Sequence, residues 1–192
     1  MGLPLFPATN DPGPSFIALL QELNISPVVG GDARLSPHAT TVVALRSDTG
    51  VVLVADRQAT SSYIANRDVR KIAQADRHTA VAISGVAATG LELQKVLQLS
   101  FEHYEKMSDD VLSLEGKANY LSSFIRRINL QGPGIVLPLL AGFDLNHNRG
   151  RVFDYDGLGG CYEKSDFATI GSGSDFAEGA LRLGYRDDMT ID

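Results

Sequence analysis

The prolines of this 192-residue chain gather at one end and divide it into two unlike parts. Six of the eight prolines precede residue 39, and only Pro133 and Pro138 follow it. Proline fixes φ and cannot donate a ladder hydrogen bond, so residues 1–39 are poor material for a sheet or a long helix. The apolar residues between Phe16 and Leu23 recur at helical spacing and allow one short helix. We expect an extended arm here, and the composition also favours a disordered tail.

From Thr40 onward, β-branched apolar runs alternate with turn residues. Residues 40–45 and 51–55 form two such runs around the turn Ser47-Asp48-Thr49-Gly50, which predicts a hairpin covered on both faces. Further strands are expected near residues 71–73, 79–84, 136–143, 151–155, 160–163 and 167–170, and helices over residues 86–106, 114–129 and 174–183. This order of strands, two helices, strands and a helix predicts an α+β layered domain rather than alternating βαβ units.

The composition argues against several classes of function. The formal net charge of −6 gives no basic surface for nucleic acid. No apolar run reaches the ~18 residues of a membrane span, and no basic segment typical of a secretory signal precedes the first apolar residues. The single cysteine, Cys161, rules out an intramolecular disulfide and a multi-cysteine zinc site. We therefore expect a cytoplasmic protein that binds neither nucleic acid nor membrane.

Familiar catalytic motifs are missing from the sequence. The four histidines are scattered and include no His-x-x-x-His pair. Neither a phosphate loop, nor a dinucleotide fingerprint, nor a Gly-x-Ser-x-Gly nucleophile elbow is present. Gly171-Ser172-Gly173-Ser174 stands between a predicted strand and a predicted helix, where main-chain amides can bind an anion. Glycine and serine are also common in ordinary turns and caps, so this signal is weak alone.

Thr40 offers a different kind of chemistry because it stands at the boundary between the arm and the domain. A threonine hydroxyl is a poor nucleophile unless a base lies beside it. If the Ala39–Thr40 bond is cut, the freed α-amine of Thr40 lies within reach of its own Oγ. The reference pKa of an α-amine, about 7.7–8.0, suits a general base near neutral pH. Taken alone, a threonine that opens a strand is nearly always a simple strand residue.

Five ordered motifs around this threonine resemble those of proteasome β-subunits. They are Thr40-Thr41-Val42-Val43-Ala44-Leu45, Ala55-Asp56-Arg57-Gln58-Ala59-Thr60, Arg67-Asp68-Val69-Arg70-Lys71, Ser84-Gly85-Val86-Ala87-Ala88 and Gly171-Ser172-Gly173-Ser174. Arg67–Lys71, His103-Tyr104-Glu105-Lys106 and Leu139-Leu140-Ala141-Gly142-Phe143-Asp144 are most similar to the actinobacterial type. The resemblance covers residues 40–192, and residues 1–39 match only in character, as a propeptide.

The resemblance implies a four-layer αββα sandwich, the N-terminal-nucleophile hydrolase fold, and a threonine endopeptidase made as a zymogen. Thr40 would be the nucleophile, and its amine the base once Ala39–Thr40 is cut autocatalytically. Lys71 would favour the neutral amine and Asp56 would hold Lys71. The Gly85 N–H would form the oxyanion hole, and Ser172 would bond near the terminal amine. Each of these residues also has an ordinary alternative, such as a surface ion pair for Asp56 and Lys71 or a strand-to-helix turn for Gly85.

The resemblance also implies a substrate site and partners. Thr60 and Ala87 would clamp an extended substrate by β-addition. The specificity pocket would be lined by Ala59, Val69, Ala73 and Ile83, whose apolar character predicts cleavage after apolar residues. The implied partners are other β-subunits, proteasome α-subunits in stacked heptameric rings, a ring ATPase or activator, and unfolded protein substrates. The chemistry needs no metal or organic cofactor.

Two features depart from the pattern of the family. Gln58 replaces the arginine usual after Asp-Arg, and Gln-Ala-Thr at this place is found in the bacterial peptidase of a two-component ATP-dependent protease, which is an alternative within the class. The second departure is that the chain ends before the closing helix and strands, which carry a supporting Asp and Ser. We therefore expect a C-terminal part to be missing from residues 40–192. The alternative from another class is a non-catalytic ring subunit or an unprocessed assembly intermediate.

Overall fold

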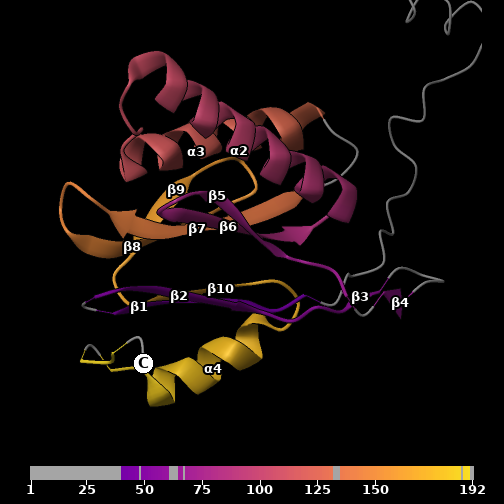
Figure 1. Ribbon diagram of the computed structural model, residues 1–192. Helices are drawn as coiled ribbons and strands as arrows, with labels where there is room; N and C mark the ends of the chain where they lie inside the picture. The colour runs from indigo at the N-terminus through magenta and orange to yellow at the C-terminus, as the bar shows by residue number, and fades with distance from the viewer. Residues whose placement is uncertain are drawn as a thin grey trace, which may run out of the picture. The chain divides into compact units, whose positions relative to one another are not determined.

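The structure is a computed structural model that describes residues 40–47, 49–60, 65–66, 68–131, 135–186 and 188–190. Within that part, two helices, a five-stranded sheet, a three-stranded sheet and one further helix are stacked in this order (Figure 1). The predicted α+β sandwich with four layers is therefore confirmed. The expected arm, residues 1–39, lies outside the described residues, so its short helix stays a prediction.

The three-stranded sheet brings Thr40 beside the Gly-Ser-Gly turn. Strands β1 (Val42–Ser47) and β2 (Gly50–Ala55) form the predicted hairpin, and β10 (Phe167–Ile170) pairs with the other edge of β1. All pairs are antiparallel, and Val42 lies opposite Ile170 on one side and Ala55 on the other. The start of β1 therefore lies beside the end of β10 and the end of β2, which lead to Gly171 and Asp56.

The five-stranded sheet carries the second half of the site. Its strands, in spatial order, are β5 (Ile72–Asp76), β6 (Thr79–Gly85), β7 (Val136–Asp144), β8 (Arg149–Tyr155) and β9 (Cys161–Lys164), and each pairs antiparallel with its neighbour. A separate short pair joins β3 (Ala59–Thr60) to β4 (Ala65–Asn66). The main chain of Ile83 donates a hydrogen bond to the Lys71 carbonyl (3.0 Å), which extends the pairing of β5 and β6 to the residue before β5.

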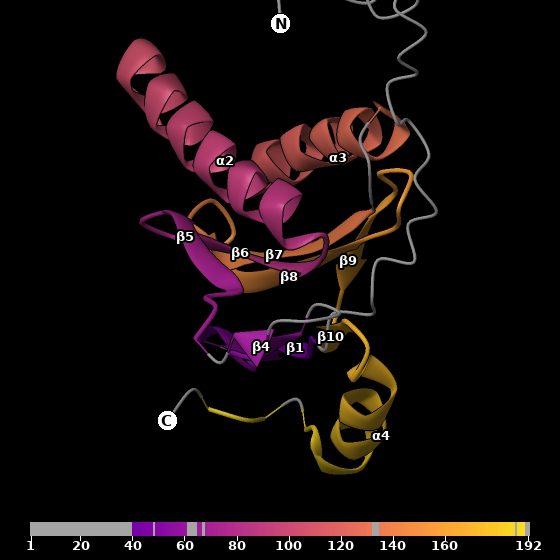
Figure 2. The ribbon, with the colours of Figure 1, turned by 90° about the vertical axis from the view of Figure 1, so that its right-hand side faces the viewer.

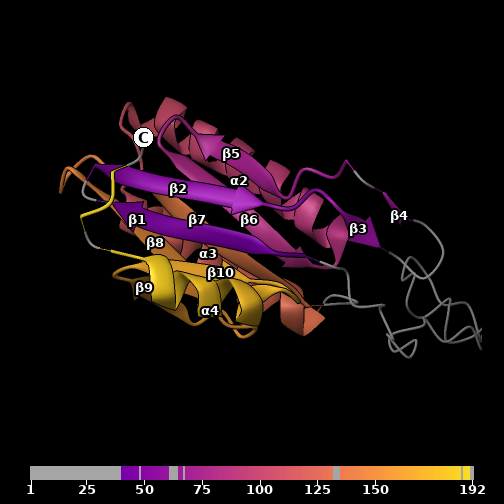
Figure 3. The ribbon, with the colours of Figure 1, turned by 90° about the horizontal axis from the view of Figure 1, so that it is seen from below.

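The helices cover the outer faces of the two sheets (Figures 2 and 3). Helices α2 (Ala87–Ser108) and α3 (Leu114–Gln131) lie over the five-stranded sheet, and α4 (Ser174–Gly184) lies against β10 and β1. Their bounds agree with the predicted ranges to within two residues. None of the helices in the described part of the chain is both long and apolar enough to cross a membrane.

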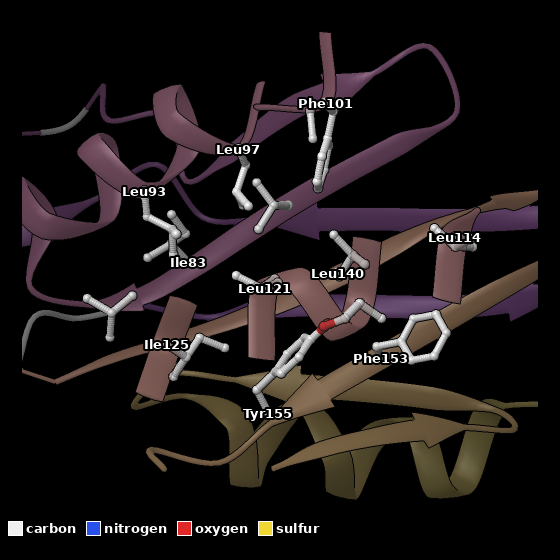
Figure 4. Packing of buried hydrophobic residues seen from close by; sticks show 14 residues of the cluster. Ile83, Leu93, Leu97, Phe101, Leu114, Leu121, Ile125, Leu140, Phe153 and Tyr155 are labelled. Atoms are coloured by element: carbon white, nitrogen blue, oxygen red, sulfur yellow. The ribbon is translucent and has the colours of Figure 1, made fainter. Parts of the chain in front are cut away.

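Two apolar clusters hold the layers together. The larger cluster lies between the helices α2 and α3 and the five-stranded sheet, where Leu93, Leu97 and Leu121 are fully buried (Figure 4). The smaller cluster lies between the two sheets and contains Val42 and Leu139. Complete burial of a leucine or valine contributes roughly 1.5–3 kcal/mol. Strand β6 contributes Ile83 to the larger cluster and Ala82 to the smaller one, so packing on both faces holds this strand, whose last residue is Gly85.

Candidate active site

Thr40 is held by the turn that follows β10. Its main-chain N–H donates to the Ser172 Oγ (3.2 Å), and its carbonyl oxygen accepts hydrogen bonds from the Gly173 N–H (3.2 Å) and the Ser172 hydroxyl (3.5 Å). The residue is only 5% exposed. Ser172 thus contacts the nitrogen that becomes the α-amine if the Ala39–Thr40 bond is cut, as the resemblance implies.

The two glycines of this turn are required by how closely it approaches Thr40. Gly171 has φ +100°, and a Cβ placed there overlaps the Thr40 carbonyl. A Cβ on Gly173 overlaps the Thr41 hydroxyl. At Gly171, only glycine tolerates both the positive φ and this approach of another main chain. In the sequence the Gly-Ser-Gly motif was a weak indication of anion binding. In the structure this turn positions Thr40.

An ion pair with a buried lysine and a half-buried aspartate lies on the other side of Thr40. The Lys71 Nζ is 2.8 Å from each carboxylate oxygen of Asp56, and it also donates to the Gln58 carbonyl (2.6 Å). The Lys71 side chain is 6% exposed, so this is not the ordinary surface pair that the sequence also allowed. The Asp56 Oδ1 accepts the Thr41 N–H at 2.7 Å, which connects the lysine to the residue after the candidate nucleophile.

Asp56 is held in its ionised form. Burial alone raises the pKa of this carboxyl, but the hydrogen bonds from Lys71 and from the main-chain N–H groups of Thr41 and Gln58 outweigh burial and lower the pKa below its ordinary 3.8. A lowered folded-state pKa stabilises the fold above the unfolded pKa, and this contribution is lost as pH falls through the folded pKa. Asp56 is therefore a carboxylate at neutral pH and a fixed partner for the Lys71 ammonium.

Gly85 ends β6 next to the start of α2. It has φ +105°, and a Cβ there overlaps the Ile135 carbonyl, which accepts the Val86 N–H at 3.2 Å. The helix begins at Ala87, so the partial positive charge of its N-terminus lies beside the Gly85 peptide. Gly85 therefore forms a strand-to-helix turn, which was its ordinary alternative role. It also lies at the N-terminal end of a helix, where a developing oxyanion can be stabilised.

Replacing Gly85 with alanine is expected to destabilise the fold by roughly 2–3 kcal/mol, because the new Cβ meets main chain and φ is positive. Thermal unfolding of the G85A variant checks this. The matched control is Gly179→Ala, because a Cβ on Gly179, inside α4, meets nothing within 4 Å. Equal melting temperatures for G85A and the unchanged protein would contradict the strain at Gly85.

One pocket joins Thr40, Lys71 and Gly85, whereas Asp56 and Ser172 lie outside its lining and are bonded to Lys71 and Thr40. It is lined by Thr40, Val69, Arg70, Lys71, Ile83, Gly85, Ala87, Gly90, Leu91 and Gln94. Three of the predicted substrate residues, Val69, Ile83 and Ala87, are among them. Ala73 is not; it packs against the larger apolar cluster instead. Ala59 and Thr60 form β3, but their side chains lie outside the described part, so their roles stay predictions.

Helix α2 contributes a wall of the pocket that the motifs did not indicate. Gly90, Leu91 and Gln94 follow Ala87 by three, four and seven residues, which places all four on one face of the helix. Helical spacing from Ala87 was the available signal. A Cβ on Gly90 would press on the Ile83 side chain at 2.6 Å, so glycine lets this helix face approach β6.

Within the described residues, no group of three or more His, Cys, Asp and Glu side chains is arranged to hold a metal ion. The polar side chains that line the pocket are instead those of Thr40, Arg70, Lys71 and Gln94, and the Asp56 carboxylate is bonded to Lys71. This set can support a hydroxyl nucleophile, a nearby positive charge and a donor for an oxyanion.

Comparison with known proteins agrees with this geometry. A family model described as "Proteasome subunit" matches residues 36–192. Proteins named "Proteasome subunit beta" are similar to the chain: that of Acidimicrobium ferrooxidans is 43% identical over 98% of this chain. Those of Streptomyces griseus and Acidothermus cellulolyticus are each 46% identical, over 81% and 83% of it.

The match covers different shares of these relatives. The chain spans 72% of the Acidimicrobium protein, 56% of the Streptomyces protein and 58% of the Acidothermus protein. The family model nevertheless covers the whole described domain, and the relatives exceed 40% identity over most of the chain. The chain therefore belongs to the proteasome subunit family.

Proposed function

We propose that this chain is a catalytic proteasome β-subunit, a threonine endopeptidase whose nucleophile is Thr40. The observation that carries the proposal is the shared pocket of Thr40, Lys71 and Gly85, with Asp56 and Ser172 bonded to its members. Residues 1–39 act as a propeptide, and the mature subunit begins after autocatalytic cleavage of the Ala39–Thr40 bond.

Cleavage of that bond is what activates the site. While Ala39 is attached, the Thr40 nitrogen is an amide that donates to Ser172 and cannot accept a proton. Cleavage turns it into an amine with a basic lone pair, a few bonds from Oγ. The positive charge of Lys71 lowers the pKa of this amine and keeps more of it neutral. Asp56 and the Gln58 carbonyl hold that charge in place.

The reaction is an acyl transfer in two halves. The amine takes the Oγ proton as Oγ bonds to the substrate carbonyl carbon, and the developing oxyanion accepts the Gly85 N–H. The C–N bond then breaks, and the leaving amine takes the proton from the α-ammonium. Water attacks the resulting ester with the same amine as base, which releases the acid and restores the Thr40 hydroxyl. One preorganised oxyanion donor is commonly worth ~3 kcal/mol.

The proposal is tested by labelling the assembled particle with an irreversible electrophilic peptide, such as a peptide vinyl sulfone, and mapping the adduct by mass spectrometry. We expect peptide hydrolysis to stop in step with adduct formation on Thr40. Absence of both adduct and hydrolysis would favour the alternative, a non-catalytic ring subunit.

The walls of the pocket predict substrate preference. Val69, Ile83, Ala87 and Leu91 contribute apolar surface. We therefore expect peptides with an apolar residue before the scissile bond to be cleaved roughly tenfold or more faster than acidic ones, because an apolar side chain gains free energy by burial against these walls and a carboxylate loses hydration there. Paired fluorogenic peptides that differ at that residue measure the ratio. Faster cleavage of the acidic peptide would overturn the pocket assignment.

Membership of the family also suggests the assembly and the partners of this chain. We propose stacked heptameric rings with other β-subunits and with α-subunits, unfolded proteins as substrates, and a separate ring ATPase or activator that supplies them. The names of the relatives favour a proteasome subunit over the bacterial peptidase of a two-component protease. The cytoplasm is the proposed compartment, since the lone Cys161 needs no oxidising environment.

A further inference from the structure

Gln94 is a polar side chain among apolar neighbours. It lies on the inner face of α2 and is only 8% exposed, although Leu93 beside it and Leu97 one turn later are core residues. A buried carboxamide is unfavourable unless it is hydrogen-bonded. Its Nε2 donates to the carbonyl oxygen of Lys71 at 3.3 Å. The bond joins the third turn of α2 to the residue that carries the proposed catalytic charge.

The Lys71 carbonyl is fixed from two directions. It accepts the Ile83 N–H of β6 at 3.0 Å as well as the Gln94 amide. The Lys71 side chain meanwhile reaches Asp56 and the Gln58 carbonyl. The helix, the five-stranded sheet and the end of β2 therefore all set the position of this one lysine.

Gln94 also belongs to the pocket itself. It lines the pocket on the helix face begun by Ala87, two turns further along, or about 10 Å from the helix start near Gly85. A carboxamide has two N–H donors and an acceptor oxygen, so the bond to Lys71 commits one donor. The residue thus links the far wall of the pocket to the catalytic lysine.

We propose that Gln94 is a positioning residue that ties the main chain of Lys71 to helix α2 and keeps the lysine charge beside Thr40. This inference rests on the proposed function. The charged groups at this part of the pocket are Lys71 before β5, Asp56 after β2, and Arg70, which also lines the pocket. Displacing Lys71 raises the pKa of the freed Thr40 amine, so the acid limb of the pH–rate profile moves to higher pH.

Two substitutions remove the hydrogen bond in different ways. Gln94→Glu keeps the shape, but its carboxylate has no N–H to donate to the Lys71 carbonyl. Gln94→Leu removes the polar group altogether. The matched control is Gln98→Leu, one turn later on α2, where the side chain is exposed. All variants are assembled into the full particle and assayed with a peptide that has alanine before the scissile bond, whose short side chain does not reach the far wall.

We expect both Gln94 variants to lower kcat about five- to tenfold, with KM within twofold and the acid limb shifted upward, while the Gln98 variant matches the unchanged particle. Unchanged kcat and pH profile in the Gln94 variants would overturn the positioning role. So would a loss that only follows a lowered melting temperature, with the pH profile of the folded particles unmoved. If the unchanged particle itself lacks a Thr40 N-terminus and peptidase activity, the proposed function fails instead.

Discussion

Replacing Thr40 with alanine is expected to abolish peptide hydrolysis, by about 10⁴-fold or more, and to leave residues 1–39 attached in the assembled particle. Alanine has no oxygen that could form the acyl intermediate, so neither self-cleavage nor substrate cleavage has a nucleophile. The fold should persist, because the hydrogen bonds of Thr40 to the Ser172 turn involve only its main chain. Peptidase assays and intact mass measure the two effects together.

Two further variants sharpen this test. Thr40→Ser keeps a hydroxyl and is expected to retain both self-cleavage and activity. Thr49→Ala removes a threonine hydroxyl from the exposed turn at the opposite end of β1 and is expected to match the unchanged protein. Particles of T40A that still release residues 1–39 would show that another residue cuts the bond.

Replacing Lys71 with methionine is expected to lower kcat/KM by about 10²- to 10³-fold at neutral pH, within the range for losing one catalytic group. Methionine has a similar length but no charge, so the amine of mature Thr40 loses its cationic neighbour. Its pKa then rises, and the acid limb of the pH–rate profile moves upward. In the unchanged protein the hydrogen bond from Lys71 does most to lower the pKa of Asp56, so in the variant this pKa rises as well. Steady-state kinetics over a range of pH measures both the loss and the shift.

The exposed Lys95 on α2 provides the control for charge alone, and Lys95→Met is expected to leave the kinetics unchanged. Lys71→Arg keeps the charge, but its planar fork has to fit a cradle made by two carboxylate oxygens and the Gln58 carbonyl. We expect it to recover part of the activity and the original acid limb. Wild-type kinetics in K71M would refute the role given to Lys71.

The layers of this fold could be predicted because local pattern decides them. The β-branched runs of β1 and β2 and the helical spacing of Leu93, Leu97 and Phe101 are properties of short segments. The pairing of β10 with β1 is different, since it joins Ala168 to Ala44 across most of the domain. Periodicity cannot specify such long-range pairing, and it was the family resemblance that implied a sandwich.

For the candidate site, too, some features could be predicted from the sequence and others could not. The motifs predicted which residues would come together, and Thr40, Lys71, Gly85, Val69 and Ile83 do line one pocket. Individual contacts were not readable from the motifs, because a hydrogen-bond partner depends on the tertiary path of the main chain.

Three details of the site illustrate this limit. The Gln58 carbonyl bonds Lys71 through its main chain, which side-chain identity does not reveal. Gln94 lies on an apolar face of α2, and the helical pattern gives no sign that its side chain bonds the Lys71 carbonyl. Ala73 was assigned to the pocket by motif position, yet it packs on the core.

The most direct measurement of the central claim is N-terminal sequencing, with intact mass, of the β-subunit in mature particles assembled with α-subunits. We expect a subunit that begins Thr40-Thr41-Val42 and has lost the mass of residues 1–39. A subunit in active, mature particles that still begins at Met1 would contradict it, because Thr40 would then have no free amine to act as its base.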